Sequence, residues 1–246
     1  MRPMRIGLVS RTDKEEAIQL AKKVADNLSH HDLYYDSELL DFLKGDPITD
    51  VDVLVVIGGD GTILRTVRKY PFPILAVKMG KCGHLCEVLP VDISSIEDIL
   101  TDHTLDQRMK LEIPEIGEAL NEVVVRAVAP DKVARFKVEY GGHCNMVAGD
   151  GIIVATPTGS TAYSLAAGGP VVEEGCPVFC ITPICSVDMT SFPWVVSSEH
   201  VITITVIDKL CHVTLDGDEP VTLSAGECIT VRKSRNYVVF WRKKGA

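Results

Sequence analysis

Apolar positions follow two alternating patterns over the first hundred residues. Residues 51–57 are apolar almost throughout, which is typical of a strand buried on both faces. Residues 14–28 instead place Ala17, Leu20 and Val24 at helical spacing. Alternating strands and helices predict a parallel sheet with crossover helices. The predicted strands are 5–10, 33–35, 51–57 and 72–77, and the predicted helices are 14–28, 38–43, 62–69 and 93–100.

The pattern changes near Thr104, where we place a domain boundary between residues 1–104 and 105–246. Beyond it, short apolar runs separated by turn residues predict an all-β, sandwich-like domain, whose last strand is a candidate to pack back on the first domain. One short helix is expected over 161–167. The predicted strands are 121–129, 133–140, 143–148, 151–155, 178–182, 201–207, 212–216, 219–223, 228–232 and 237–241.

Composition narrows the class of protein. The 246 residues carry a formal net charge of −9, which argues against a nucleic-acid partner or an anionic membrane surface. We find neither a signal peptide nor a run of about 20 apolar residues, so a cytoplasmic location without membrane contact is expected. The eight cysteines lack the paired spacing of a zinc site, so we expect reduced thiols and no cysteine-bound metal.

A glycine-rich turn, Gly58-Gly59-Asp60-Gly61-Thr62, directly follows the buried strand 51–57. Glycines let backbone N–H groups approach an anion, and the following helix adds unpaired donors at its N-terminus. The carboxylate of Asp60 suits a metal ion or the proton of an attacking hydroxyl. The alternative is that Asp60 only caps the helix. The turn matches neither of the two common phosphate-loop fingerprints.

A second cluster is rich in hydroxyl groups. Asp150-Gly151 opens a strand that ends in the run 156–164, Thr-Pro-Thr-Gly-Ser-Thr-Ala-Tyr-Ser. Small donors hydrogen-bond a sugar or a base, and an aromatic ring offers a stacking face. The alternative is a helix N-cap, and both interpretations are compatible. The candidate ligand-binding residues of this run are Thr158, Ser160, Thr161, Ala162 and Tyr163.

An amide lies beside a carboxylate at Asn121-Glu122, at the start of a predicted strand. Together, these groups can bind a base edge and a ribose diol. The alternative is a solvated strand start. The interpretation of the pair as a binding site is supported only by its combination with the two clusters described above.

Together, the glycine turn, Leu120-Asn121-Glu122, Asp150-Gly151 and the hydroxyl run resemble the NAD kinase family in order and separation, and Gly168-Gly169-Pro170 extends the match. The glycine turn alone is shared with diacylglycerol and sphingosine kinases, whereas the hydroxyl run is far more specific. The resemblance implies an N-terminal Rossmann-like α/β domain and a C-terminal β-sandwich-like domain that binds NAD.

The resemblance also implies a reaction, the transfer of a phosphoryl group from ATP or polyphosphate to the 2′-hydroxyl of the adenosine ribose of NAD, with Mg²⁺. Asp60 would be the catalytic carboxylate. Asn121 and Glu122 would hold the adenosine, and family members are homodimers or homotetramers. The remaining implied contacts are Gly58, Gly59, Gly61 and Thr62 for the donor phosphates, and Asp150, Thr161, Ala162 and Tyr163 for the dinucleotide.

The sequence departs from the family pattern at three places. Lys78 replaces an amide and offers a cation to a phosphate, and His84 replaces an aromatic residue, although an imidazole still stacks. The usual proline-histidine-serine reads Ser186-Val187-Asp188 here, and no role is carried over to it.

Two alternatives stay open at this point. A lipid kinase of the diacylglycerol or sphingosine type shares the glycine turn, but it would need an apolar acceptor cavity. A nucleotide-binding regulator without turnover is the other, although a binder has no need of the base at Asp60.

Overall fold

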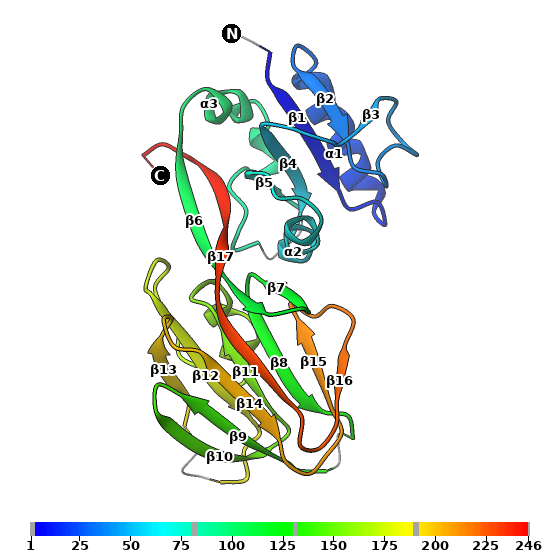
Figure 1. Ribbon diagram of the computed structural model, residues 1–246. Helices are drawn as coiled ribbons and strands as arrows, with labels where there is room; N and C mark the ends of the chain where they lie inside the picture. Colours follow the sequence, from blue (N-terminus) through cyan, green and yellow to red (C-terminus); the bar gives the residue numbers. More distant parts are fainter. Residues whose placement is uncertain (1–2, 80–82, 130–131, 189–191, 246) are drawn as a thin grey trace. The chain divides into compact units, whose positions relative to one another are not determined.

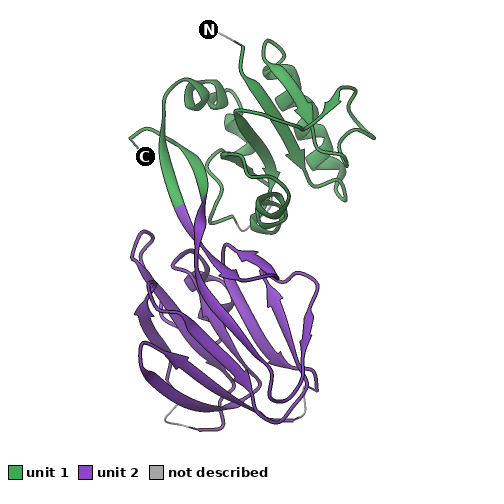
Figure 2. Cartoon of the chain, viewed as in Figure 1, with its two compact units in different colours: residues 1–107, 238–246 green, residues 108–237 purple. Residues whose placement is uncertain are grey.

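The computed structural model describes residues 3–79, 83–129, 132–188 and 192–245 (Figure 1). The chain forms two compact units (Figure 2). Residues 1–107 and 238–246 make up the first, the α/β unit, and residues 108–237 make up the second, the β unit. Two strands pass from one unit into the other, β6 (His103–Ile113) and β17 (Cys228–Lys243).

A parallel sheet forms the centre of the α/β unit, in the order β17-β5-β4-β1-β2-β3. Its strands are β1 (Arg5–Ser10), β2 (Asp32–Tyr35), β3 (Asp46–Pro47), β4 (Val53–Gly58), β5 (Ile74–Lys78) and the end of β17. Its helices are α1 (Glu15–Asn27), α2 (Asp60–Lys69), the 3₁₀ helix η1 (Pro90–Asp92) and α3 (Ser95–Thr101).

Helices α1 and α3 contribute to the core of this unit through their apolar faces. Val24 of α1 and Ile96 of α3 belong to one buried cluster with Ile6, Val55 and Val77 of the central strands. Every residue of β4 is buried, as its uninterrupted apolar sequence predicts. The burial holds the carboxyl end of β4, where the glycine turn begins, in a fixed position.

The β unit contains two antiparallel sheets. One has the order β13-β12-β11-β8-β15-β16, and the other consists of β10-β9-β14-β17, with β6 paired to β17 and β7. The strands are β7 (Gly117–Ala119), β8 (Glu122–Ala127), β9 (Ala134–Tyr140), β10 (His143–Gly149), β11 (Gly151–Ala155), β12 (Val178–Ile184), β13 (Trp194–Ser197), β14 (Ile202–Val206), β15 (Cys211–Leu215) and β16 (Val221–Leu223). Two short helices, η2 (Thr158–Thr161) and α4 (Tyr163–Ala166), follow β11.

The core of the β unit lies between its two sheets. Val125 and Val154 from the first sheet share a buried cluster with Phe136, Ile204 and Val231 from the second. Alternate residues of these strands face inward, which is the arrangement of a β-sandwich. The predicted fold class, an α/β domain followed by a sandwich-like all-β domain, is confirmed.

The prediction of a helix over 38–43 is wrong, because the chain makes consecutive turns there. The N–H of Leu39 donates to the carbonyl of Asp36, and the N–H of Phe42 donates to the carbonyl of Leu39. A six-residue segment gains too few hydrogen bonds to offset helix nucleation.

The helix predicted over 161–167 is instead split into η2 and α4. The backbone leaves helical geometry at Ala162, where φ is −96° and ψ is −124°. Ser160 lies just before this break, and its Oγ donates to the carbonyl of Pro157 and accepts the N–H of Val172. These bonds hold the hydroxyl run in its irregular shape.

The two strands predicted at 228–232 and 237–241 are one continuous strand, β17. The polar residues between the two predicted strands do not form a turn, because their side chains make hydrogen bonds within the strand region. Ser234 and Asn236 both donate to the carboxylate of Glu118. Strands β3, β6, β7 and β13 were not predicted.

No helix in the described parts of the chain is long and apolar enough to cross a membrane.

Gly159 sets a close approach on which the β unit depends. A Cβ at this position would lie 2.1 Å from the carbonyl oxygen of Asn121, and that contact is to backbone. We expect Gly159→Ala to lower the melting temperature, with a loss of roughly 1–3 kcal/mol typical of overpacking. Thermal and urea unfolding of the purified variant measure the effect.

The matched control is Gly61→Ala, because no atom lies within 4 Å of a Cβ at that helical position. Alanine is favoured over glycine inside a helix, so the control should not be destabilised. Equal melting temperatures for Gly159→Ala and the wild type would contradict the close approach.

Candidate active site

The glycine turn connects β4 to α2 at the carboxyl edge of the parallel sheet. Gly59 is the N-cap residue of α2, and Asp60 is its first residue. A Cβ on Gly58 would lie 2.3 Å from Oγ1 of Thr62, so the turn closes tightly against that side chain. Gly61 faces open space. The first N–H groups of α2 therefore lack carbonyl partners within the helix and lie beside unfilled volume.

The carboxylate of Asp60 does not cap α2, so the capping alternative is wrong. Its Oδ2 accepts the backbone N–H of His84 at 3.2 Å, and its Oδ1 accepts that of Leu85 at 3.2 Å. These bonds tie the turn to the loop after β5. Each oxygen keeps a free lone pair, so the carboxylate is fixed in place and still able to accept a hydroxyl proton.

A cavity of about 330 Å³ lies against the turn, and two arginines help to line it. Arg11 follows β1 and is held by Asp13 at 2.6 Å, and Arg65 of α2 pairs with Glu38 at 3.2 Å. Lys78 ends β5 directly beside Gly58 in the strand register. Cationic side chains and the start of a helix give this edge the character of an anion site. The lining residues are Arg11, Asp13, Gly59, Gly61, Thr62 and Arg65.

In the β unit, the carboxylate of Asp216 fixes the start of β8. Its Oδ2 accepts the N–H of Leu120 at 2.6 Å, and its Oδ1 accepts those of Asn121 at 2.8 Å and Glu122 at 3.0 Å. Thr156 adds a further bond, since its Oγ1 donates to the carbonyl of Leu120 at 2.6 Å. The segment is thus clamped from two sides, and this fixes the backbone that carries the amide and the carboxylate.

Glu122 is a buried carboxyl whose Oε2 has no hydrogen-bond partner among the described residues. Burial, followed by the nearby charge of Asp216, raises the pKa of Glu122 to about 7, while the N–H of Tyr163 opposes the rise. An isolated buried acceptor of this kind is costly unless a ligand satisfies it. Glu122 and Tyr163 both line a cavity of about 390 Å³.

The hydroxyl run uses much of its bonding capacity internally. Thr156 Oγ1 accepts the N–H of Gly159 at 3.1 Å, and Thr161 Oγ1 donates to the carbonyl of Thr158. The hydroxyl of Ser160 is buried and already bonded on both sides. Thr161 is exposed, whereas Tyr163 is half-buried and packs in part against a buried apolar cluster.

The structure gathers the predicted residues into groups within each unit. The α/β unit brings Asp60 together with the loop at His84 and places Lys78 beside Gly58. Between Lys78 and His84, residues 80–82 lie outside the described residues. In the β unit, Asn121 and Glu122 lie against the hydroxyl run, with Asn121 accepting the N–H of Thr156.

Asp150 does not join the group at Asn121 and Glu122. It lies at the opposite end of β11, where its carbonyl accepts the N–H of Ala127. The glycines beside it are required by packing. A Cβ at Gly149 would lie 2.7 Å from the carbonyl of Ile184, and a Cβ at Gly151 would lie 2.4 Å from that of Val125.

Sequence reasoning did not identify five residues that shape these cavities. One is Asp216, whose backbone turns sharply before Gly217, with φ at +49°. The other four depend on strand register or on contacts between distant segments, and no local pattern marks them: Arg11, Arg65, Arg126 and His212.

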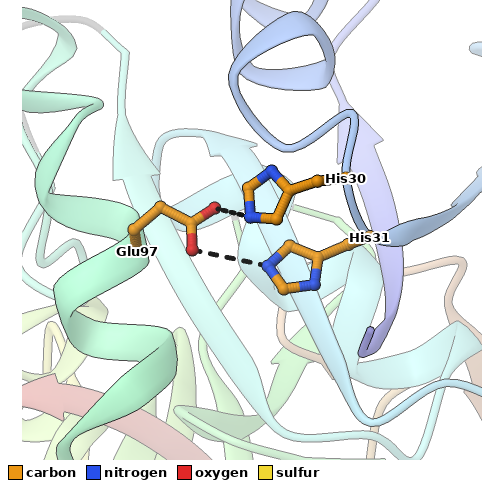
Figure 3. Close-up of side chains that lie close together, drawn as sticks. All are labelled: His30, His31 and Glu97. Atoms are coloured by element: carbon orange, nitrogen blue, oxygen red, sulfur yellow. Dashed lines mark hydrogen bonds and ion pairs between the residues drawn. The ribbon is translucent and has the colours of Figure 1, made fainter. Parts of the chain in front are cut away.

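A cluster of His30, His31 and Glu97 has the residue types of a metal site (Figure 3). The Glu97 carboxylate lies 3.1 Å from Nε2 of His30 and 3.4 Å from Nε2 of His31. However, Nδ1 of His31 accepts the backbone N–H of Met4 at 3.1 Å, so Nε2 carries the proton of the neutral ring. Since a metal ligand needs a lone pair on that nitrogen, we interpret the cluster as a hydrogen-bonded link between α3 and the end of α1.

The described cysteines are free thiols. Burial, and then the charge of Asp60, raises the pKa of Cys86 to about 11, and burial likewise raises that of Cys180 to about 11. These buried thiols are protonated near neutral pH, and a protonated thiol is a poor nucleophile and metal ligand.

Comparisons with known proteins agree on one family. Residues 41–106 match the model of the ATP-NAD kinase N-terminal domain, and residues 120–243 match that of the ATP-NAD kinase C-terminal domain. A protein named NAD kinase from Thermococcus gammatolerans is 39% identical, over 97% of this chain and 94% of that protein.

Two solved structures have the same fold. An NAD kinase from Archaeoglobus fulgidus in complex with ATP has a TM-score of 0.81 and 28% identity, over 98% of this chain and 94% of that chain. Yeast NADH kinase complexed with NADH has a TM-score of 0.85 over 98% of this chain and 84% of that chain; at 21% identity it shows the fold alone.

Glu122 should make the stability of the protein depend on pH. Its pKa is about 7 in the fold against 4.5 as the ordinary value, so ionisation favours the unfolded chain between these values. We expect Glu122→Gln to exceed the wild type in free energy of unfolding by a margin that grows from pH 4.5 to 7. The margin should level off above pH 7 at about 3 kcal/mol.

Urea unfolding at pH 4.5, 6 and 8 measures this margin. Glu173→Gln, at an exposed position of the same unit, is the matched control and should show no such growth. A margin for Glu122→Gln that is constant with pH would contradict the raised pKa.

The tautomer of His31 can be measured by NMR. A long-range ¹H–¹⁵N spectrum should show a protonated Nε2 and an unprotonated Nδ1, because Met4 donates to Nδ1. One equivalent of Zn²⁺ should leave these signals unchanged. Displacement of the Nε2 proton by zinc would instead identify a metal site.

Proposed function

Because the chain belongs to the NAD kinase family, we propose that it transfers the terminal phosphoryl group of ATP or polyphosphate to NAD, giving NADP. The acceptor is the 2′-hydroxyl of the adenosine ribose. The observation that carries the proposal is the fixed carboxylate of Asp60 at the start of α2, beside a cavity that Arg11 and Arg65 help to line. A lipid kinase, which shares only the glycine turn, is not favoured by the family matches.

The α/β unit holds the phosphoryl donor in this proposal. The backbone N–H groups at Gly59, Asp60 and Gly61 bind phosphate oxygens, and the hydroxyl of Thr62 lies in the same cavity. Lys78 supplies a cation at the neighbouring strand end, and His84 offers its exposed ring for stacking. Asp60 accepts the proton of the attacking hydroxyl as the new P–O bond forms.

The β unit holds the dinucleotide. Asn121 contacts the base edge, and Glu122 accepts hydrogen bonds from a ribose diol, which would satisfy its free Oε2. Tyr163 lies in the same cavity and offers a ring face. Thr158, Ser160, Thr161 and Ala162 shape the wall beside it, and Asp150 contacts the dinucleotide from the far end of β11.

A divalent metal fits the donor site. Mg²⁺ is usually bound through one or two carboxylates together with substrate phosphates, and Asp60 keeps a lone pair on each oxygen. When bound, Mg²⁺ would neutralise the charge of the transferring phosphoryl group. The chain itself positions the donor through the glycine turn and accepts the hydroxyl proton at Asp60.

We further propose that the protein is cytoplasmic and forms a homodimer or homotetramer, with NAD and either ATP or polyphosphate as its ligands and no nucleic acid or membrane as partner. Its net charge of −9 supports the last two points.

The test is NADP formation from NAD, Mg²⁺ and either ATP or polyphosphate, read with an NADP-specific dehydrogenase. Asp60→Asn should lower kcat by about 10²–10⁴ while NAD binding, measured by calorimetry, is kept. Asp41→Asn, at an exposed position of the same unit, is the matched control and should keep full activity.

Two results would go against the proposal. Undiminished kcat in Asp60→Asn would remove the catalytic role of this carboxylate. If the wild-type protein binds NAD but forms no NADP with either donor, the protein is a nucleotide-binding regulator without turnover.

A further inference from the structure

The cavity at Glu122 extends well beyond the residues assigned above. It runs along the outer face of β8 and β15 and encloses about 390 Å³, towards the small end of the range for ligand sites. Glu122 and Tyr163 lie at one end. Arg126, four residues further along β8, and His212 of β15 line it beyond them.

Arg126 and His212 are direct neighbours across the sheet. They are partners in the antiparallel register of β8 and β15, so their side chains leave the same face. In the described parts of the chain, neither side chain has a hydrogen bond or an ion pair. A guanidinium and an imidazole therefore lie side by side with their N–H donors unused.

Arg126 is exposed and His212 is half-buried, so both side chains are accessible to a ligand. An anion that bridges the guanidinium and the neighbouring imidazole would accept hydrogen bonds from both, and those from the guanidinium are charge-assisted. Among the described residues that line the cavity, Glu122 is the only acidic one. Because it is four residues away along β8, its Cα lies about 13 Å from that of Arg126. Asp150 precedes the strand next to Arg126 but does not line the cavity.

Glu122 provides an independent indication of a ligand. It is 8% exposed, lines the same cavity, and its Oε2 has no partner among the described residues. The cavity thus offers a buried carboxyl oxygen without a partner at one position and accessible guanidinium and imidazole donors at the other. A carboxylate suits a sugar diol, and an arginine suits a phosphate. Ribose linked to phosphate carries both groups.

We propose that Arg126 and His212 form an anion subsite that holds the pyrophosphate of the dinucleotide, with the attached ribose on Glu122. This inference rests on the proposed function, because it takes NAD as the ligand. It adds two specificity-determining residues to the site. The size of the cavity suits one mononucleotide half of the dinucleotide rather than the whole.

The experiment compares the dissociation constants of NAD and adenosine, since adenosine has the ribose diol but no phosphate. Calorimetry gives the first, and competition against NAD gives the second. Arg126→Gln should weaken NAD binding about 10- to 100-fold, the range for one hydrogen bond to a charged group. His212→Gln should have a smaller effect of the same kind. Adenosine binding should change less than about 2-fold in both variants.

Two further variants sharpen the result. Arg126→Lys keeps the charge but loses the planar fork, so it should recover part of the NAD affinity. Arg135→Gln is the matched control, because Arg135 belongs to the same unit, is exposed and does not line the cavity. It should bind NAD as the wild type does. Melting temperatures and elution volumes of all variants should match the wild type.

The proposal is overturned by unchanged NAD affinity in Arg126→Gln, or by an equal loss for NAD and adenosine. A changed oligomer size that accompanies the loss would assign the pair to a subunit contact and overturn it as well. A different result would refute the proposed function. Wild-type protein that forms no NADP, yet binds NAD in an Arg126-dependent manner, would refute the kinase and keep the subsite.

Discussion

The carboxylate of Asp216 is the contact on which the β unit's site depends. It accepts three consecutive backbone N–H groups at the start of β8, and its own N–H donates back to the carbonyl of Glu122. Three such bonds to one charged acceptor hold a strand end more firmly than the sheet ladder alone. Burial raises the pKa of Glu122, and the charge of the same acid adds to that rise. One side chain therefore fixes the position of Glu122 and also makes its ionisation harder.

Close backbone approach is the constraint shared by both units. Gly58 packs under Thr62, and Gly159 packs on the carbonyl of Asn121. In each case a loop reaches a geometry that no side chain would permit, and polar backbone groups are brought to a surface that a ligand can contact. The carboxylate of Asp60 is also positioned by backbone groups, namely two N–H groups of a different loop. Both turns thus position polar groups through glycine and backbone hydrogen bonds.

The sequence was sufficient for those features that local chemistry determines. The buried strand β4, the amphipathic helix α1 and the turn at Gly58–Thr62 all follow from period and composition. The long strand β17 was divided in error, because the polar residues at its centre look like a turn until Glu118 is known to pair with them. For the same reason, the neighbours Arg126 and His212 could not be foreseen. They lie 86 positions apart, and only the strand register brings them together.

A buried carboxyl oxygen without a partner is a liability to the fold, and the structure retains one in Oε2 of Glu122. A glutamine there would keep the shape without the charge, so packing alone gives no reason for the acid. A ligand that donates hydrogen bonds supplies the missing reason, since its hydroxyls would satisfy Oε2. Arg126 and His212 add hydrogen-bond donors to the same cavity, and no described protein group accepts from them. A buried acceptor without a partner and accessible donors in one cavity favour a ligand that carries hydroxyls and phosphate together over one that is wholly anionic or wholly neutral.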